Sequence, residues 1–231
     1  MHNKLQLDVF KGLLARACAA ALWAGPYAAA CMLLSLPCSC ESSSKGTMAD
    51  SYYLNANKDL RELGRVTLVE LDNTSNSPDI SRDVTKALFL ELQKKQVFSV
   101  ATVGRKDPAW QALQENLDSP QAMQALLLIR EKFKSNGLLV GTITEYRPYP
   151  RLAIGLRLKL IDLADGQLLW GVEQVWDSTD RNVQKRMQAY YRKDRRSDAN
   201  PLPEELVAVS PLEFIRFAAY EIAQTLDGRK K

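Results

Sequence analysis

Apolar and polar residues alternate most regularly between positions 151 and 163, RLAIGLRLKLIDL. Every second residue from 152 to 160 is leucine or isoleucine, and the residues between them are charged or small. Such alternation gives a strand one apolar face and one wet face. Residues 137–146 also have strand character, and the turn Ala164-Asp165-Gly166 leads into a third strand at 167–176. The pattern predicts an antiparallel three-strand meander.

Upstream of the meander, strand patterns alternate with helical ones. Residues 65–71 and 96–103 are rich in β-branched and apolar residues, which is typical of strands. The stripe between them predicts a helix over 79–95 that is capped by Asp79, and Ser119-Pro120 marks the start of another helix. The first helix is expected to bury Ile80, Val84, Ala87, Leu88 and Leu92, and the second Ala122, Leu126, Ile129 and Phe133.

Two further helices are expected towards the end of the chain. One covers 180–193, and the other begins at the capping box Ser210-Pro211-Leu212-Glu213. The expected buried residues are Val183, Met187, Tyr190 and Tyr191 in the first, and Leu212, Ile215, Ala219, Ile222 and Leu226 in the second. Together the elements predict an α/β fold: a mixed sheet with a C-terminal antiparallel three-strand meander and helices packed on it.

The amino-terminal segment has the pattern of an export signal. Residues 1–16 carry three basic residues and one acidic residue, and residues 17–40 carry no charge. A basic start followed by an apolar run and small residues is typical of a secretory signal. All four cysteines lie in this segment, and Cys40 stands where it turns into the polar stretch ESSSKGTMAD.

This junction resembles a bacterial lipoprotein signal, in which a peptidase cuts before a cysteine whose sulfur receives a diacylglycerol. We therefore predict a lipoprotein signal peptide over 1–40, lipid attachment at Cys40 and a flexible tether over 41–50. Residues 51–231 would form a single periplasmic domain. Cys38 and Cys31 are alternative processing sites, and a plain cleaved signal or a retained membrane anchor stays open.

Charge and residue types argue against several classes of function. The net charge of +4 divides into +2 for residues 1–40 (three basic, one acidic) and +2 for the rest (28 basic, 26 acidic). A nucleic-acid binder needs a larger basic excess, so we expect no nucleic-acid partner. His2 is the sole histidine, and neither a Gly-rich phosphate loop nor a His/Cys metal spacing occurs. We expect no enzyme, no cofactor and no metal site, and interpret Asp162 and Asp165 as turn residues rather than an acid/base pair.

The order of these elements resembles a known periplasmic domain. The resemblance is carried by residues 66–73, 83–88, 98–100 and 160–170. It is the domain shared by the penicillin-binding-protein-activating lipoproteins, the curli secretion lipoprotein and the amino-terminal part of the Tol-system propeller protein. The curli lipoprotein inserts long membrane strands into this domain, whereas the connection here at 146–151 is short, so a pore is not expected. The resemblance implies a protein that docks onto an envelope partner.

Two groups of residues are candidates for partner binding. The first is the expected hairpin connection with Tyr146, Arg147, Tyr149 and Arg151, because exposed tyrosine and arginine are favoured at interfaces. The second is a basic run that includes Arg181, Lys185 and Arg186. The competing interpretations are a hairpin that packs on its own base and a solvated helix face.

The sequence therefore predicts a non-enzymatic protein, lipid-anchored at the periplasmic face of the outer membrane, that docks onto an envelope or wall-synthesis protein. The alternative is a structural subunit of an envelope assembly or export apparatus, in which edge strands pair between copies as a homo-oligomer.

Overall fold

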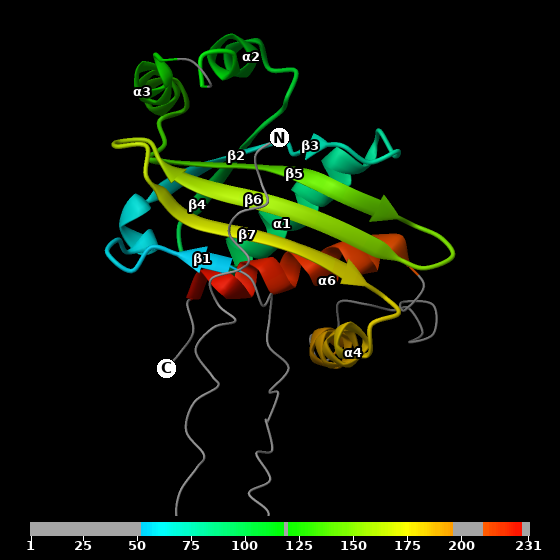
Figure 1. Ribbon diagram of the computed structural model, residues 1–231. Helices are drawn as coiled ribbons and strands as arrows, with labels where there is room; N and C mark the ends of the chain where they lie inside the picture. Colours follow the sequence, from blue (N-terminus) through cyan, green and yellow to red (C-terminus); the bar gives the residue numbers. More distant parts are fainter. Residues whose placement is uncertain (1–51, 118–119, 196–209, 228–231) are drawn as a thin grey trace, which may run out of the picture. The chain divides into compact units, whose positions relative to one another are not determined.

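The folded part is built on one mixed sheet. The computed structural model describes residues 52–117, 120–195 and 210–227 (Figure 1). The described strands are β1 (Tyr52–Leu54), β2 (Arg65–Val69), β3 (Asp72–Asn73), β4 (Ser99–Val103), β5 (Gly137–Arg147), β6 (Ala153–Asp162) and β7 (Leu168–Asp177). Their order is β1-β7-β6-β5-β2-β4, with β3 paired to β5. The predicted α/β class with a mixed sheet is confirmed.

Strands β5, β6 and β7 form the predicted antiparallel meander. Leu139 pairs with Leu160 across β5 and β6, and Leu158 pairs with Val172 across β6 and β7. The apolar residues at alternate positions of β6 are buried, as predicted. On its other face Arg157 is exposed, as expected, but Gly155 is buried beneath Thr144 and Val175 of the neighbouring strands.

Strand β2 lies between two parallel neighbours and is covered on both faces. It pairs in parallel with β4 and with β5. Leu68 belongs to the large core beneath α1, whereas the adjacent Val69 packs in a smaller core on the opposite face. Because side chains alternate along a strand, two layers of helices are needed to bury such a strand.

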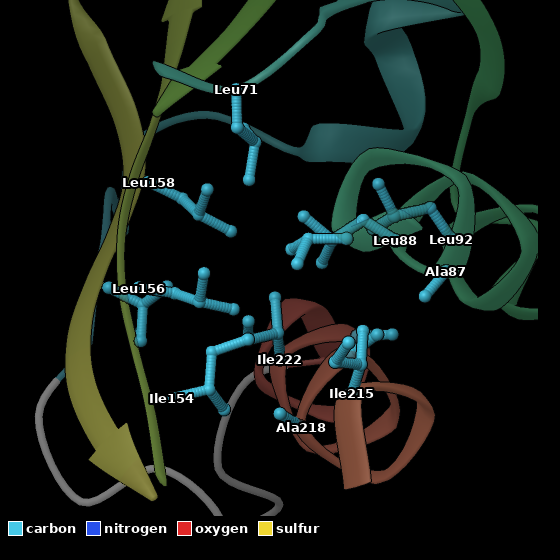
Figure 2. Packing of buried hydrophobic residues seen from close by; sticks show 14 of the residues in the cluster. Leu71, Ala87, Leu88, Leu92, Ile154, Leu156, Leu158, Ile215, Ala218 and Ile222 are labelled. Atoms are coloured by element: carbon cyan, nitrogen blue, oxygen red, sulfur yellow. The ribbon is translucent and has the colours of Figure 1, made fainter. Parts of the chain in front are cut away.

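Helices cover the two faces in separate groups. The described helices are α1 (Ile80–Lys95), α2 (Pro108–Gln114), α3 (Ala122–Phe133), α4 (Arg181–Arg195) and α6 (Pro211–Gln224), with 3₁₀ turns at Leu60–Leu63 and Thr225–Asp227. Helices α1, α4 and α6 contribute to the large core, and Figure 2 shows side chains of β6 pointing towards α1 and α6. Helices α2 and α3 lie on the opposite face, where Trp110 and Ile129 pack against Val69 and Leu138 (Figure 1).

Several helix predictions need correction at their ends. Asp79 makes no capping hydrogen bond, because its backbone is already helical (φ −85°, ψ −7°), whereas a cap needs an extended backbone. Helix α3 begins at Ala122, after Pro120, and Gln121 rather than Ser119 precedes its first turn. Ser210 does cap α6, since its side chain accepts the Glu213 N–H.

The predicted buried stripes hold for most positions. In α4, all four expected residues are buried. In α6, Leu212 is 53% exposed, whereas Phe214 and Phe217 are buried. Helix α6 packs beneath the sheet and against α1 and α4, so a wider arc of its surface is covered than one stripe. The sequence pattern predicted none of β1, β3 and α2.

The predicted signal, Cys40 with its alternatives Cys38 and Cys31, and the tether over 41–50 lie outside the described residues. Within the described ranges, none of the helices is both long enough and apolar enough to cross a membrane. The same part of the chain holds no group of three histidine, cysteine or acidic side chains placed to bind a metal ion.

Candidate functional site

The β5–β6 connection presents an exposed tyrosine between arginines. Tyr149 is 87% exposed, and Arg147 and Arg151 beside it are exposed as well. Tyr146, by contrast, is partly buried and packs against the large core. Burial raises the pKa of the Tyr146 phenol, and the nearby negative charge of Asp83 adds to the shift. Three of the four predicted tip residues are therefore accessible to a partner, and Tyr146 anchors the base of the hairpin.

Ion pairs hold the tip in place. Nε of Arg147 donates to Glu145 at 2.7 Å, and its guanidinium also reaches Asp177 at the end of β7 at 3.3 Å. The hydrogen bond to Glu145, followed by the charge of Glu145, raises the pKa of Arg147. The backbone N–H of Ser178 donates to the Leu152 carbonyl at 2.8 Å. These contacts tie the tip to the segment that leads into α4.

The second candidate group divides between surface and interior. Arg181 and Lys185 of α4 are exposed. Arg186 is only 13% exposed at its side chain, and its Nε donates to Glu221 of α6 at 2.8 Å. Arg186 therefore has a partner inside the fold, whereas Arg181 and Lys185 remain accessible. Helix α4, which carries them, follows the end of β7, where Ser178 is bonded to Leu152 of the hairpin connection (Figure 1).

The two aspartates near the β6–β7 turn stabilise that turn. Asp162 accepts the Ala164 N–H at 2.8 Å, and Asp165 accepts the Gln167 N–H at 3.0 Å. The Lys58 ammonium bridges both carboxylates, at 2.6 Å from Asp162. The hydrogen bond that Lys58 donates to Asp165 lowers the pKa of Asp165, and the one from the Gln167 N–H lowers it further. The contacts are those of the turn residues that the sequence indicated.

A pocket that the sequence pattern did not predict lies at the ends of β2 and β4. It has a volume of about 220 Å³, and its walls include Glu70, Arg82 and Lys86. These residues are far enough apart in sequence that only the fold brings them together. The local signal was limited to Arg82 and Lys86, whose spacing of four places two cations on one flank of a helix.

Comparison with known proteins gives distant structural likenesses. No family model matches the chain, and neither does any curated protein. A PelC dodecamer from Paraburkholderia phytofirmans is 15% identical, with a TM-score of 0.41 over 58% of this chain and 89% of that chain. Lipoprotein GNA1162 from Neisseria meningitidis is 13% identical, with a TM-score of 0.39 over 59% of this chain and 98% of that one.

A third likeness is to the LpoB C-terminal domain from Salmonella enterica, at 17% identity and a TM-score of 0.35. It covers 49% of this chain and 83% of that chain. At TM-scores below 0.5 and such identities, these likenesses are too distant to assign this chain a function, a partner or an assembly.

Proposed function

We propose that this chain is a non-enzymatic protein, lipid-anchored at the periplasmic face of the outer membrane, that docks onto another envelope protein. The observation that carries the proposal is the junction at Cys40. An uncharged segment of 24 residues ends there, a polar stretch follows, and the first described strand begins at Tyr52. Two or three acyl chains on that cysteine would anchor the protein stably in a membrane.

The hairpin tip is the docking element in this proposal. Tyr149 combines a large apolar ring with a hydroxyl, and its 87% exposure leaves most of that surface free to be buried by a partner. Arg151 adds a charge that favours an acidic partner surface, whereas the charge of Arg147 is already paired with Glu145 and Asp177. Arg181 and Lys185 of the following helix α4 are exposed and supply further positive charge.

Site-specific photo-cross-linking in native membranes tests this proposal. A photoreactive residue at Tyr149 should cross-link to one defined envelope protein, and Arg147→Ala together with Arg151→Ala should weaken that product. The matched control is the same probe at Val175, which is 49% exposed on β7 and lies outside the tip. Equal products from both positions, or none from Tyr149, would count against the tip as the docking element.

The alternative, a structural subunit of a larger envelope assembly or export apparatus, has support from strand β4. This strand pairs with β2 and forms an end of the sheet order, and its sequence SVATV has no charge and no proline. Charges, prolines and bulges are the usual protection of an edge strand against pairing with another copy. Size-exclusion chromatography with light scattering on the full chain in detergent separates the two proposals. A monomer favours docking, and a stable ring or polymer favours the assembly subunit.

A further inference from the structure

The pocket at the ends of β2 and β4 occupies a place where open α/β sheets bind ligands. Glu70 follows β2, Val103 ends β4 and Gly104 follows it, and Arg82 and Lys86 come from the intervening α1. After β2 the chain passes to α1 on one face of the sheet, and after β4 it passes to α2 on the other face (Figure 1). Neighbouring parallel strands whose connections leave in opposite directions leave a crevice at their carboxyl ends.

Two cations, Arg82 and Lys86, lie beside this crevice. Within the described residues, neither Arg82 nor Lys86 forms an ion pair, and both are exposed. Arg82 lies in the first turn of α1, where the helix dipole disfavours a positive charge. The two like charges are four residues apart, so they also repel each other. A bound anion would turn each of these costs into a favourable interaction.

The other walls indicate what kind of anion fits. Glu70 presents a carboxylate whose Oε2 accepts the Arg105 N–H at 3.2 Å, so a ligand should bring a donor to that side. The same carboxylate repels a dianionic phosphate more strongly than it repels a carboxylate. Phe89 and Val103 add apolar surface. At about 220 Å³ the pocket is smaller than the roughly 300 Å³ at which drug-sized sites begin, so it suits a ligand of amino-acid size.

Hydrogen bonds join the elements that form the walls. The Leu71 N–H donates to the Thr85 hydroxyl at 3.1 Å, which ties the end of β2 to α1. The Glu70 N–H donates to the Val103 carbonyl at 2.8 Å, which ties the end of β2 to β4. A site built on strand ends and a helix needs little rearrangement to bind.

We propose that this pocket binds a small organic carboxylate that also carries an N–H donor, such as an acylated amino acid. The carboxylate pairs with Arg82 and Lys86, the N–H donates to Glu70, and the apolar side chain packs against Phe89 and Val103. This site is separate from the hairpin tip, and it depends on neither the lipid anchor nor the docking proposal.

Saturation-transfer NMR on the full chain in detergent micelles tests this site with N-acetyl-L-leucine as the probe. Saturable binding is expected, and N-acetyl-L-leucine amide, which lacks the carboxylate, should not bind. Arg82→Gln with Lys86→Gln should weaken binding roughly tenfold or more, because two charge-assisted hydrogen bonds are lost. Gly104→Leu should block the pocket independently, since a Cβ there would lie 3.7 Å from Oε2 of Glu70, in van der Waals contact, and the rest of the leucine side chain would compete with a ligand for the space beside Glu70.

The chain offers a closely matched control pair. Arg130 and Lys134 have the same residue types and spacing, and they line a different pocket at the end of α3. There the cations suit the carboxyl end of the helix, so they have a stabilising role of their own. Arg130→Gln with Lys134→Gln should leave probe binding unchanged, and circular dichroism establishes that each variant is folded.

Four results would overturn the proposal. They are absence of saturable binding, equal binding of the amide, equal loss in both double variants, and binding of inorganic phosphate in place of the carboxylate. If the Arg82/Lys86 variant unfolds, Gly104→Leu still decides the location, because binding that survives in a folded Gly104→Leu protein excludes this pocket.

Discussion

At the scale of single residues, the buried carboxylate of Glu221 holds two partners from different elements. Its side chain is 4% exposed, one carboxylate oxygen accepts Nε of Arg186 at 2.8 Å, and the other accepts the Trp176 indole N–H at 2.8 Å. One carboxylate thus joins α6 to α4 and to β7. Such a pair is costly to break because the remaining cation stays buried without compensation.

We expect Glu221→Ala to destabilise the protein by about 3 to 5 kcal/mol, since it strands both Arg186 and the indole N–H. Chemical denaturation followed by circular dichroism measures this change. The control is Glu213→Ala on the same helix, which removes a pair with the 53% exposed Arg216 and should cost about 1 kcal/mol. Equal effects of the two substitutions would contradict a special role for the buried pair.

The Lys58 bridge predicts how stability responds to acid. Lys58 holds the pKa of Asp165 below its ordinary value of 3.8. The folded carboxylate is thus harder to protonate than the unfolded one, so its contribution is present above pH 3.8 and is lost as the pH falls below it. In Lys58→Met, the midpoint of thermal unfolding should be lower near neutral pH and should fall less steeply below about pH 4.

Arg147→Met is the matched comparison for this titration. Hydrogen bonds from Thr179 are the main cause of the lowered pKa of Asp177, and Arg147 is a smaller one. Removing Arg147 should therefore change the acid slope less than removing Lys58. An acid slope that Lys58→Met leaves intact would show that the bridge does not set the pKa of Asp165.

At the scale of elements, the spacing of apolar residues was sufficient to predict an element wherever one face of it meets the core and the other meets water. The leucines of β6 and the buried stripe of α4 were predictable for this reason. Strand β1 was not, because a three-residue strand has no period and depends on pairing Tyr53 with Gly171, which is remote in sequence. Helix α2 did carry a signal in Asp107-Pro108, where Asp107 accepts the Ala109 N–H at 2.8 Å. Its seven residues make only about two turns, and Trp110 is the one residue of the helix that is buried, so its apolar stripe was weak.

Two glycines of the meander make opposite predictions for the same substitution. A Cβ at Gly141 of β5 would lie 2.3 Å from Leu158 and 2.5 Å from the Arg157 carbonyl, so the strands would have to move apart. At Gly171 of β7 the nearest atom would lie at 3.5 Å. Gly141→Ala should therefore destabilise by about 1 to 3 kcal/mol, whereas Gly171→Ala should change stability by less than about 0.5 kcal/mol.

Urea denaturation of both variants checks this pair. Similar stabilities of the two would mean that β5 and β6 are not packed as closely as the structure has them.

At the scale of the whole molecule, the candidate sites differ in how far the sequence could predict them. The tip residues Tyr149 and Arg151 lie within three positions of each other, so one connection brings them together wherever the hairpin forms. The pocket instead joins Glu70, Arg82 and Gly104, which meet only through the β2-α1-β4 crossover. Its prediction required the parallel pairing of β2 with β4, and no local period encodes that pairing.

The central claim of the proposed function is that the molecule is exported and anchored through a lipid on Cys40. The intact mass of the protein extracted from its native membranes tests them most directly. We predict a mass equal to a chain that begins at Cys40 plus its acyl groups. A mass equal to the unmodified 231-residue chain, or to a fragment without lipid, would contradict the lipid anchor.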